Sequence, residues 1–594
     1  MLTKISQVTE EVTLFLRNLG FSNYYIIKIF DLVGDAAIAL TEDNPYWLLE
    51  EFPHMTFAKV DEAAQKLGVE RDSLYRIRAA IRHGLSGYVS RGHTFAPARE
   101  FCSQIGEFLS LNSEQIKDVL DDMALEGDLH ITVLEGKEVV YFYGLYKMEC
   151  QIVSSVIALM DKPPKPMGAD MNAIILRAER DSNITLSEKQ RRAVRDSLNQ
   201  SISIITGGPG TGKTTIINTL IRIMEAGGLN VAVAAPTGRA AKRISETSGK
   251  HAMTVHRLLD YYYDEEARQM AFGRNKEHPL EYDAVIIDEA SMMDLMLTGA
   301  LCRALRDDCR LILTGDANQL PSVGAGNVLG DFIDSGYIFT STLTEIFRQA
   351  QESNIVVNSH RINRGEYPEF GEDFVLVPQD KQAEILKTIV NIASKYDLNQ
   401  VQVLTPVKKG ILGSENLNTY LQQAFNPPAD DKEELSFGST VFRSGDRVMQ
   451  VKNNYKLEYK RPDGKTGRGI FNGETGVVKA VHSEEKKLTV CFDDERWVEY
   501  PYIQLDEIEL AYAVTVHKSQ GSEFPVVIIP MSWFPPALAT RNLIYTAVTR
   551  GKEKVIVVGK QEYFNAMVEN VQIGKRNSGL KCRLQGIYNS ITIS

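Results

Sequence analysis

Short apolar runs alternate with helical stretches along the chain beyond about Ser187. One set of β-branched and aliphatic runs lies at 202–205, 231–234, 284–287 and 311–313, and a second at 401–404, 526–529 and 555–558. Short strands that alternate with helices are typical of crossover units on a parallel sheet. The pattern therefore predicts two α/β units, each with its own parallel sheet.

Residues 445–501, between strands of the second unit, have a different pattern. Apolar runs at 447–451, 476–478 and 488–492 are short, and Asp463-Gly464 and Asn472-Gly473 mark turns. Asp-Gly and Asn-Gly pairs favour the tight turns of antiparallel hairpins. We predict a small antiparallel barrel inserted into the second α/β unit.

The N-terminal part of the chain is predicted to be mainly helical. From Val12 to about Tyr88, apolar residues recur three and four positions apart and are interrupted by glycines, as in helical hairpins. Residues 98–145 then predict two helices, the second capped by Asn112 with Gln115, and two strands joined at Glu135-Gly136. Helices followed by a β-hairpin are typical of a winged-helix domain.

These patterns divide the chain into seven segments, as expected for 594 residues, more than one hydrophobic core usually supports. We expect a helical, helix-hairpin-helix-like region at 1–95, a winged-helix-like region at 96–150, a partly helical linker at 151–186, a first α/β core at 187–342, a second core at 343–440 and 506–594, and the inserted barrel at 441–505.

Composition narrows the class of protein. With 43% apolar and 24% charged residues the chain is typical of a soluble globular protein. No apolar run approaches the ~18 residues of a membrane span and the N-terminus has no secretory signal, so we expect a cytoplasmic protein without a membrane partner. The 6 cysteines form no C-x-x-C pair, which indicates reduced thiols. A net charge of -11 argues against a generally basic nucleic-acid coat but allows a local basic groove.

The strongest chemical motif is GGPGTGKT at 207–214, which fits G-x-x-x-x-G-K-[ST] between a predicted strand and a helix. Glycines let backbone N–H groups surround a phosphate, Lys213 supplies a positive charge for the β- and γ-phosphates, and the Thr214 hydroxyl can bind Mg²⁺. The expected nucleotide-binding residues here are Gly207, Gly208, Pro209, Gly210, Thr211, Gly212, Lys213, Thr214 and Thr215.

Two carboxylates follow the predicted strand at 284–287. A carboxylate at the end of a hydrophobic strand is costly unless it serves a cation, so we expect Asp288 to hold Mg²⁺ with Thr214. Glu289 is then placed to activate the attacking water. The alternative is that Asp288 only caps the following helix.

Two arginines are candidates for the second unit's contribution to hydrolysis. Arginine binds phosphate oxygens bidentately and stays charged, and a unit that closes over a nucleotide should supply it. Arg348 follows Ile346-Phe347, and Arg550 ends the run Tyr545-Thr546-Ala547-Val548-Thr549. Taken singly, each also fits a surface ion pair.

Together these motifs resemble superfamily 1 helicases, and most closely the RecD-like DNA helicases. The resemblance covers about Leu186 to Ile587. The matching segments, in the order that the family shows, are 207–214, 235–241, 288–292, 313–327, 347–349, 514–521 and 545–550.

The N-terminal region resembles the long form of RecD-like proteins, which works without RecB and RecC subunits. The similarity lies at Asn44-Pro45-Tyr46, Leu67-Gly68-Val69 and Arg91-Gly92-His93-Thr94. Thr56 stands where a helix-hairpin-helix turn generally has glycine, so this hairpin has a structural role as an alternative to phosphate binding. Because the chain begins close to the first hairpin, we expect a further N-terminal domain of the long form to be missing.

The resemblance implies a multidomain α/β fold with two RecA-like P-loop cores, an SH3-like barrel, and a helical N-terminal region of helix-hairpin-helix and winged-helix character. It also implies that Gln319, beyond the apolar run at 311–313, faces the γ-phosphate, while Asp316 and the following loop link nucleotide state to DNA contacts. A β-hairpin at about 262–282 resembles a pin that splits the duplex, and Tyr261-Tyr262-Tyr263 would pack around it.

Further site residues follow from the same resemblance. Gln190 would read the adenine edge, and Gly521 and Glu523 would lie at the nucleotide, with Glu523 close to the ribose. The residues expected to contact single-stranded DNA are Pro236, Thr237, Arg239 and His256 in the first core, and Thr405, Lys408, Thr515 and His517 in the second. Such contacts are mainly to the DNA backbone, so sequence specificity should be weak.

The function that the resemblance implies is an ATP- and Mg²⁺-dependent DNA helicase. It would act as a monomer, 5′ to 3′, on single-stranded DNA and at junctions with duplex, in repair or recombination, with single-strand-binding or repair proteins as partners. The alternatives are a subunit of a helicase–nuclease complex, a DNA-binding scaffold switched by ATP, and an RNA helicase of the same superfamily.

Overall fold

The structure is a computed structural model that describes residues 9–52, 55–167, 170–264, 269–347, 352–430, 432–492, 495–571 and 576–592. The chain divides into two compact units. Unit 1 holds Met1–Glu149 with two segments from later in the chain, Gly324–Gly326 and Asn577–Cys582; unit 2 holds the remainder.

Unit 1 consists of short helices followed by a small sheet, as predicted. The sheet is antiparallel in the order β1-β3-β2, and Asn112 with Gln115 forms the predicted capping box at the start of α9. The sheet takes in Phe95, so the expected boundary at 95 falls inside a strand. The elements are α2 (Glu10–Asn18), α3 (Asn23–Val33), α4 (Ala37–Asp43), α5 (Trp47–Glu51), α6 (Phe57–Lys66), α7 (Leu74–Ser90), β1 (Phe95–Pro97), α8 (Ala98–Leu109), α9 (Ser113–Leu125), β2 (Leu129–Leu134) and β3 (Lys137–Phe142).

A buried ion pair joins the helices of unit 1. Arg76 on α7 donates from Nε to Asp61 Oδ1 on α6 at 2.8 Å, and the Tyr46 hydroxyl donates to the same oxygen at 2.5 Å. Burial alone would raise the pKa of Asp61, but hydrogen bonds from Arg76 and Tyr46 and the charge of Arg76 together lower it. The pair therefore fixes how α6 and α7 pack.

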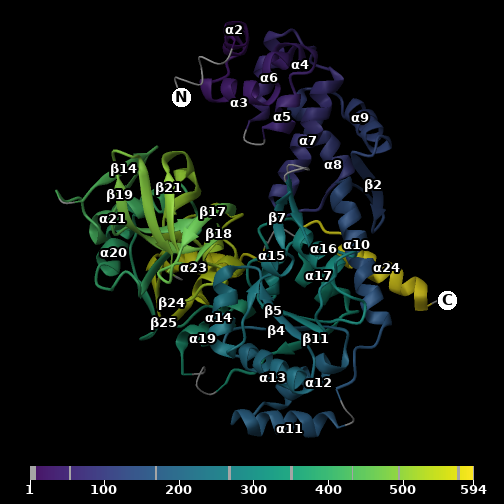
Figure 1. Ribbon diagram of the computed structural model, residues 1–594, viewed down its shortest axis with the longest axis vertical. Coiled ribbons are helices and arrows are strands. Elements are labelled where there is room, and N and C mark those ends of the chain that lie inside the picture. The colour runs from purple at the N-terminus through teal and green to yellow at the C-terminus, as the bar shows by residue number, and fades with distance from the viewer. Residues whose placement is uncertain are drawn as a thin grey trace. The chain divides into compact units, whose positions relative to one another are not determined.

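The first core of unit 2 is a parallel sheet in the order β11-β4-β10-β9-β5-β6. Side chains on β10 alternate between its faces: Ile312 packs with α12, α13 and α14, while Leu311 and Leu313 pack with α16 and α17, so helices cover both sides (Figure 1). The elements are α12 (Glu188–Asn199), β4 (Ile202–Gly207), α13 (Lys213–Ala226), β5 (Val231–Ala235), α14 (Gly238–Ser248), β6 (Met253–Thr254), α15 (Val255–Leu258), β9 (Ala284–Ile287), α16 (Leu295–Ala304), β10 (Arg310–Gly315), α17 (Val328–Ser335) and β11 (Phe339–Leu343).

The second core is also a parallel sheet, in the order β12-β25-β24-β13-β23. Its three predicted strands are present, each longer than its apolar run by one to several residues. The elements are α19 (Asn354–Arg364), β12 (Phe374–Val377), α20 (Gln382–Ala393), β13 (Val401–Thr405), α21 (Ser414–Phe425), β23 (Ala513–Thr515), β24 (Phe524–Met531), α22 (Arg541–Val548), β25 (Gly551–Gly559) and α23 (Gln561–Glu569).

The inserted barrel is a seven-stranded antiparallel sheet in the order β18-β17-β21-β20-β19-β16-β22. It ends later than the expected residue 505, because β22 pairs with β16 and completes the sheet. A short hairpin, β14 (Glu434–Phe437) with β15 (Thr440–Arg443), precedes it. Its strands are β16 (Arg447–Gln450), β17 (Asn454–Lys460), β18 (Thr466–Ile470), β19 (Thr475–His482), β20 (Lys487–Phe492), β21 (Trp497–Pro501) and β22 (Ile508–Leu510).

The hairpin of the first core begins about where the sequence suggested but ends earlier than the expected residue 282. It is formed by β7 (Tyr261–Asp264) and β8 (Gln269–Phe272), with its tip outside the described residues. The three tyrosines therefore form its first strand and do not pack around a hairpin at 262–282. Consecutive aromatic residues favour an extended backbone, and this preference decides the position.

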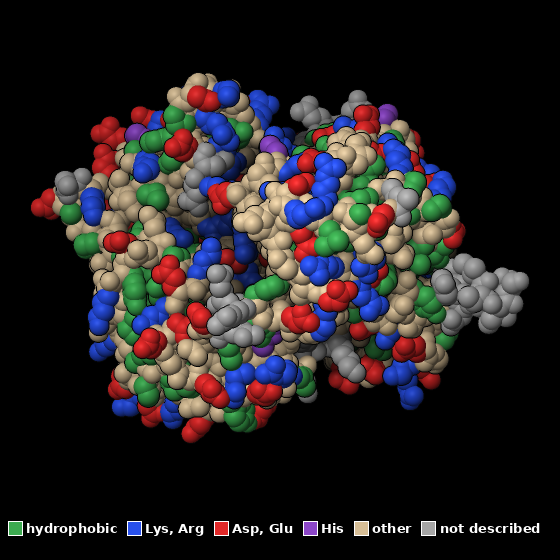
Figure 2. Space-filling model, turned by 90° about the horizontal axis from the view of Figure 1, so that it is seen from below, with side chains coloured by type: hydrophobic (Ala, Val, Ile, Leu, Met, Phe, Trp, Pro, Cys, Tyr) green, Lys and Arg blue, Asp and Glu red, His purple; other side chains and the backbone are tan. Residues whose placement is uncertain are grey.

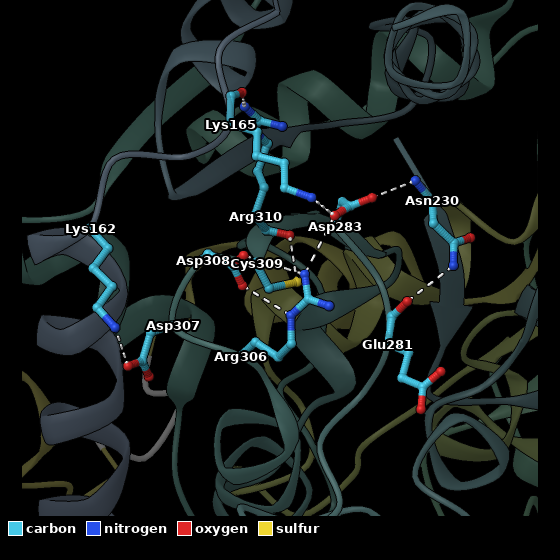
Figure 3. A network of polar contacts seen from close by, with 10 residues as sticks. All are labelled: Lys162, Lys165, Asn230, Glu281, Asp283, Arg306, Asp307, Asp308, Cys309 and Arg310. Atoms are coloured by element: carbon cyan, nitrogen blue, oxygen red, sulfur yellow. Dashed lines mark hydrogen bonds and ion pairs between the residues drawn. The ribbon is translucent and has the colours of Figure 1, made fainter. Parts of the chain in front are cut away.

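The linker begins as a helix and continues as an extended, Pro-rich segment, 162–166, which we call the strap. Helix α10 (Tyr143–Asp161) runs through the expected boundary at 150, and helix α11 (Met171–Ser182) follows the Pro-rich segment. Lys162 pairs with Asp307 at 2.6 Å, and Lys165 pairs with Asp283 (Figure 3). The buried Arg310 donates to the carbonyl oxygens of Lys165 and Leu198. These contacts fix the strap to the amino-terminal edge of the first sheet, away from the P-loop.

The expected range 506–594 placed the whole C-terminal segment in the second core, but part of it belongs to unit 1. Asn577–Cys582 packs in unit 1, and helix α24 (Leu580–Thr592) starts within it. Among the described residues, no helix is both long and apolar enough to cross a membrane. Acidic and basic side chains are interspersed over the face drawn in Figure 2.

Candidate nucleotide and DNA site

The P-loop connects β4 to α13 in the backbone form that its glycines predict. Gly210 and Gly212 have φ of 72° and 79°, a region that favours glycine. A Cβ on Gly212 would lie 2.3 Å from Gln190 Nε2. Lys213, the first residue of α13, donates from Nζ to the Gly208 carbonyl oxygen at 3.1 Å, and the Thr211 hydroxyl donates to the same oxygen at 2.9 Å. The helix N-terminus and the lysine thus lie beside the loop, in the arrangement that a phosphate-binding loop requires.

Asp288 and Glu289 directly follow β9. Asp288 Oδ1 accepts a hydrogen bond from the Thr314 hydroxyl of β10 at 2.5 Å, which holds its carboxylate at the strand ends. Asp294, not Asp288, caps the next α-helix by accepting from Leu297 N–H. Glu289 has φ of 53°, an uncommon backbone for a non-glycine residue.

The environment of Glu289 suits a general base. Burial raises its pKa, and the neighbouring Asp288 carboxylate raises it further. The positive charges of Arg550, Lys213 and Arg243 act in the opposite sense. A carboxylate whose pKa is moved toward neutrality takes a proton from water more readily than an ordinary glutamate.

The loop after β10, residues 316–320, extends from the first core to the second, and we call it the sensor loop. Asp316 is fully buried, and its Oδ2 accepts from the Tyr545 hydroxyl of α22 at 2.6 Å. The backbone N–H of Leu320 donates to Thr546 Oγ1 at 2.9 Å, and its carbonyl oxygen accepts from Gln520 Nε2 at 2.8 Å. Three buried hydrogen bonds therefore tie this loop to the second core.

Gln319 lies inside the same loop. Its side chain is buried, its Nε2 lies 3.5 Å from Asp316 Oδ2, and its Oε1 has no hydrogen-bond partner among the described residues. It lines a cavity of about 250 Å³ together with Ser291, Asn542 and Arg576. Its expected contact with a γ-phosphate stays a prediction.

The two candidate arginines differ. Arg550 is 3% exposed and donates to the carbonyl oxygens of Thr546 and Ser522 at 3.2 Å each. It is therefore no surface ion pair, and its charge acts on Glu289 across the cores. Arg348 lies outside the described residues.

Gln190 contacts the P-loop from α12. Its Oε1 accepts from Ser187 N–H in a capping box, and its Nε2 donates to the Thr211 carbonyl oxygen at 3.3 Å. The backbone N–H of Phe347 donates to the Gly210 carbonyl oxygen at 3.2 Å. Gln190 and Phe347 thus border the P-loop, and the adenine contact of Gln190 stays a prediction.

Glu523 is engaged differently from the expectation. It forms ion pairs with Arg243 of α14 at 2.5 Å and with Lys552 at 3.3 Å. Gly521, with φ of 72°, lies against α14: a Cβ there would be 2.7 Å from Thr237 Oγ1. Glu523 therefore joins the cores through an ion pair, and Gly521 allows their close approach. The contact of both residues with nucleotide stays a prediction.

The DNA-contact candidates of the first core lie at the start of α14 and at α15. Thr237 caps α14 through its hydroxyl, beside Pro236. Arg239 donates to Ser522 Oγ at 2.7 Å and to Thr475 Oγ1 of the barrel. Burial lowers the pKa of His256, although the charge of Asp294 opposes this shift, and the net effect favours the neutral ring.

The DNA-contact candidates of the second core differ in burial and in their partners. Thr405 is fully buried and its hydroxyl donates to the Leu412 carbonyl oxygen at 2.7 Å, so in this conformation it supports its own turn. Lys408 pairs with Glu509 at 2.7 Å but is about half exposed. Thr515 precedes His517, whose pKa burial and the charge of Arg576 both lower. The DNA contacts of all four residues stay predictions.

Comparison with known families covers much of the chain. A model of the AAA domain matches residues 190–325, and a model of the UvrD-like helicase C-terminal domain matches 510–558. The ATP-dependent RecD-like DNA helicase SH3 domain matches 417–492, and the ATP-dependent RecD2 DNA helicase HHH domain matches 6–95. The ATP-dependent RecD2 DNA helicase of Deinococcus radiodurans is 31% identical over 538 residues, which are 89% of this chain and 71% of that protein. The chain belongs to the RecD2 DNA helicase family.

More distant relatives of this RecD2 helicase are also found. The RecBCD enzyme subunit RecD of Mycolicibacterium smegmatis is 28% identical over 491 residues, which are 75% of this chain and 82% of that protein. Among solved structures, Bacteroides Pif1 bound to ssDNA is 19% identical, with a TM-score of 0.38 over 63% of this chain and 92% of that one.

Some residues of this RecD2 helicase that meet at the site were not singled out from the sequence. Tyr545 was quoted only as part of a motif, yet it makes the buried bond to Asp316. His360 of α19 lies with Nε2 3.1 Å from the Pro209 carbonyl oxygen of the P-loop. Arg243, one turn after Arg239, pairs with Glu523. The motif was the available signal for Tyr545, whereas His360 and Arg243 have no local signature because their partners lie in the other core.

Proposed function

We propose that this RecD2-family helicase hydrolyses Mg²⁺-bound ATP between its two RecA-like cores and moves 5′ to 3′ along single-stranded DNA. It would work as a monomer that opens duplex at junctions during repair or recombination. The single observation that carries the proposal is the sensor loop, because it leaves the strand edge beside Asp288 and makes buried hydrogen bonds to the other core.

Each step of hydrolysis has a residue suited to it. The P-loop amides and Lys213 bind the β- and γ-phosphates, and Arg550 lies where its charge acts on the same site. Glu289 accepts the proton of the attacking water. The oxygens of Thr214 and Asp288 suit a hard cation, and bound Mg²⁺ would neutralise charge on the phosphates.

Movement follows from how the cores are joined. Residues of α22 hydrogen-bond the sensor loop, and Arg243 with Glu523 adds an ion pair between the cores. A change at the γ-phosphate that displaces Gln319 or Asp316 would therefore shift the second core against the first. Because the predicted DNA contacts are divided between the cores, such a shift would move one set of contacts along the strand.

The test is ATP-dependent unwinding of two matched duplexes, one with a 5′ single-stranded tail and one with a 3′ tail. We expect opening of the 5′-tailed duplex alone, and a loss of about 10²-fold or more in Lys213→Ala. Lys250→Ala, which removes a surface lysine paired with Glu225, is the matched control and should behave as wild type. Opening of only the 3′-tailed duplex would contradict the polarity, and equal competition by RNA would favour an RNA helicase.

A further inference from the structure

The segment Arg91-Gly92-His93-Thr94 has no role in the site described above, although it is one of the segments that resemble the RecD-like family. It joins the end of α7 to β1 in unit 1. Gly92 has φ of 89°, so the backbone turns sharply there. The Arg91 guanidinium lies 4.8 Å from the centre of the Tyr88 ring, and the His93 ring lies 5.5 Å from it on a tilted contact. Contacts of Arg91 and His93 with the Tyr88 ring therefore stabilise the turn.

Two segments from far along the chain bind to this turn. The backbone N–H of Gly326 donates to the Gly92 carbonyl oxygen at 2.9 Å. The backbone N–H of Asn577 donates to His93 Nδ1 at 2.9 Å, and the Asn577 carbonyl oxygen accepts from Thr94 N–H at 2.7 Å. The turn thus offers an acceptor to each of two foreign backbones, and we call it the dock.

A buried carboxylate fixes the second of these segments. Glu149 is fully buried; its Oε1 accepts from the Thr94 hydroxyl at 2.7 Å and from Gly579 N–H at 3.0 Å. Its Oε2 accepts from the Tyr141 hydroxyl at 3.1 Å. A Cβ on Gly579 would lie 2.4 Å from that hydroxyl oxygen, so the segment fits without slack. Buried polar networks of this kind specify one arrangement.

Both segments are continuous in sequence with residues of unit 2 that lie next to the sensor loop. Gly326 follows Ser322 by four residues, and Asn577 follows Arg576 without a gap. Arg576 donates from Nη1 to Ser322 Oγ at 3.2 Å and from Nη2 to the Ser322 carbonyl oxygen at 2.5 Å. Arg576 and Ser322 therefore join the two segments to each other just before each segment reaches the dock.

We propose that the dock transmits displacement of the sensor loop to the N-terminal region, so that ATP hydrolysis is coupled to duplex opening through His93. This inference rests on the proposed function and deepens it. Gly326 follows Ser322 by four residues, so their Cα atoms can separate by at most about 14 Å and a larger shift of the loop must displace Gly326. His93 acts through Asn577 and not on nucleotide or DNA directly, so it is a positioning residue.

The test compares two substitutions in the full-length protein. His93→Leu removes the acceptor, and His93→Asn keeps one because its Oδ1 lies near the position of Nδ1. For His93→Leu we expect single-strand-stimulated kcat and KM for ATP within about twofold of wild type, but about fivefold slower opening of the 5′-tailed duplex, as for one lost buried hydrogen bond. His93→Asn should restore opening to within about twofold of wild type. His251→Leu, at an exposed histidine of the first core, is the control.

Further variants separate the dock from simple damage to the fold. If His93→Leu does not fold, His93→Gln replaces it, because its oxygen reaches the Nε2 position and cannot accept from Asn577. Arg576→Gln combined with the His93 variant should slow opening no more than the worse single change, since both act on one path. Equal rates of unwinding by His93→Leu and His93→Asn would overturn the proposed role of the dock. So would a fall in ATP hydrolysis by His93→Leu that parallels its fall in unwinding. Absence of DNA-stimulated hydrolysis in wild type would instead overturn the proposed function.

Discussion

The two parallel sheets of unit 2 end differently at their carboxyl edges. In the first core, β4, β9 and β10 end in the P-loop, in Asp288-Glu289 and in Asp316. In the second core, β13 ends in Thr405, whose hydroxyl is buried and bonded within its own turn. The second core instead meets the site with the side chains of α22 and with Arg550.

This difference indicates a division of labour between two similar folds. Ligands of open α/β sheets bind beyond the carboxyl ends of strands, and in the first core three of these ends carry the predicted nucleotide-site residues. The second core contacts the carboxyl edge of the first sheet through hydrogen bonds to the sensor loop. We therefore propose that one sheet performs the chemistry and that the other responds to it.

The largest expected effect is at Glu289, the proposed general base of the first core. Glu289→Gln keeps the size and removes the proton acceptor, so we expect DNA-stimulated kcat to fall about 10²- to 10⁴-fold while nucleotide binding persists. Steady-state hydrolysis and nucleotide titration measure the two quantities. Glu281→Gln, at an exposed glutamate just before β9, is the control. Hydrolysis near the wild-type rate would place the base elsewhere.

The next effect tests the second core's charge on that base. Arg550 opposes the raised pKa of Glu289, so Arg550→Gln should raise that pKa further. Because the base must be deprotonated, kcat would then fall with decreasing pH from a higher pH than in wild type, besides dropping about tenfold or more at neutral pH. A pH profile of kcat measures the shift.

Arg550→Lys sharpens the same prediction. Lysine keeps the charge but loses the planar fork, so the acid limb should stay near that of wild type while kcat stays low. Arg364→Gln, at an exposed arginine paired with Glu366, should change neither. An acid limb that does not move in Arg550→Gln would separate Arg550 from the base.

The smallest effect is expected at Glu523. If its role is the ion pair with the partly exposed Arg243, Glu523→Gln should change KM for ATP by no more than about twofold, since such pairs contribute ~0.2–1 kcal/mol. The effect should shrink further at high salt. If Glu523 binds the ribose instead, KM should rise about tenfold at any salt concentration. Hydrolysis measured at two ionic strengths distinguishes the two roles.

The sequence allowed the cores and the barrel to be predicted because their strands are buried on both faces or bounded by clear turns. The run at 284–287 matches β9 residue for residue. The hairpin at Tyr261 was expected to extend to about residue 282, beyond its observed end at Phe272. Its three tyrosines were expected to pack around it, because the preference of aromatic residues for strands was weighed below an expected insertion. Chain segments that change units, such as Asn577–Cys582, have no periodic signal, since backbone hydrogen bonds to distant residues hold them.

The candidate site divides in the same way. The P-loop and Asp288-Glu289 were predictable because each chemical task needs a fixed residue type at a fixed spacing. The roles of Tyr545, His360 and Arg243 were not, because each depends on a partner more than 150 residues away in the other core, beyond any local pattern. For Thr405, burial alone separates a supporting hydroxyl from a ligand contact.

The most direct test of this division of labour is the ATP consumed per base pair opened on the 5′-tailed duplex, in wild type and in Tyr545→Phe. The substitution removes one hydroxyl and leaves the buried Asp316 carboxylate without that donor. We predict DNA-stimulated hydrolysis within about threefold of wild type and a rise of about fivefold or more in ATP per base pair. Tyr420→Phe, at an exposed tyrosine of α21, should match wild type. An unchanged ratio in Tyr545→Phe would contradict coupling through the sensor loop.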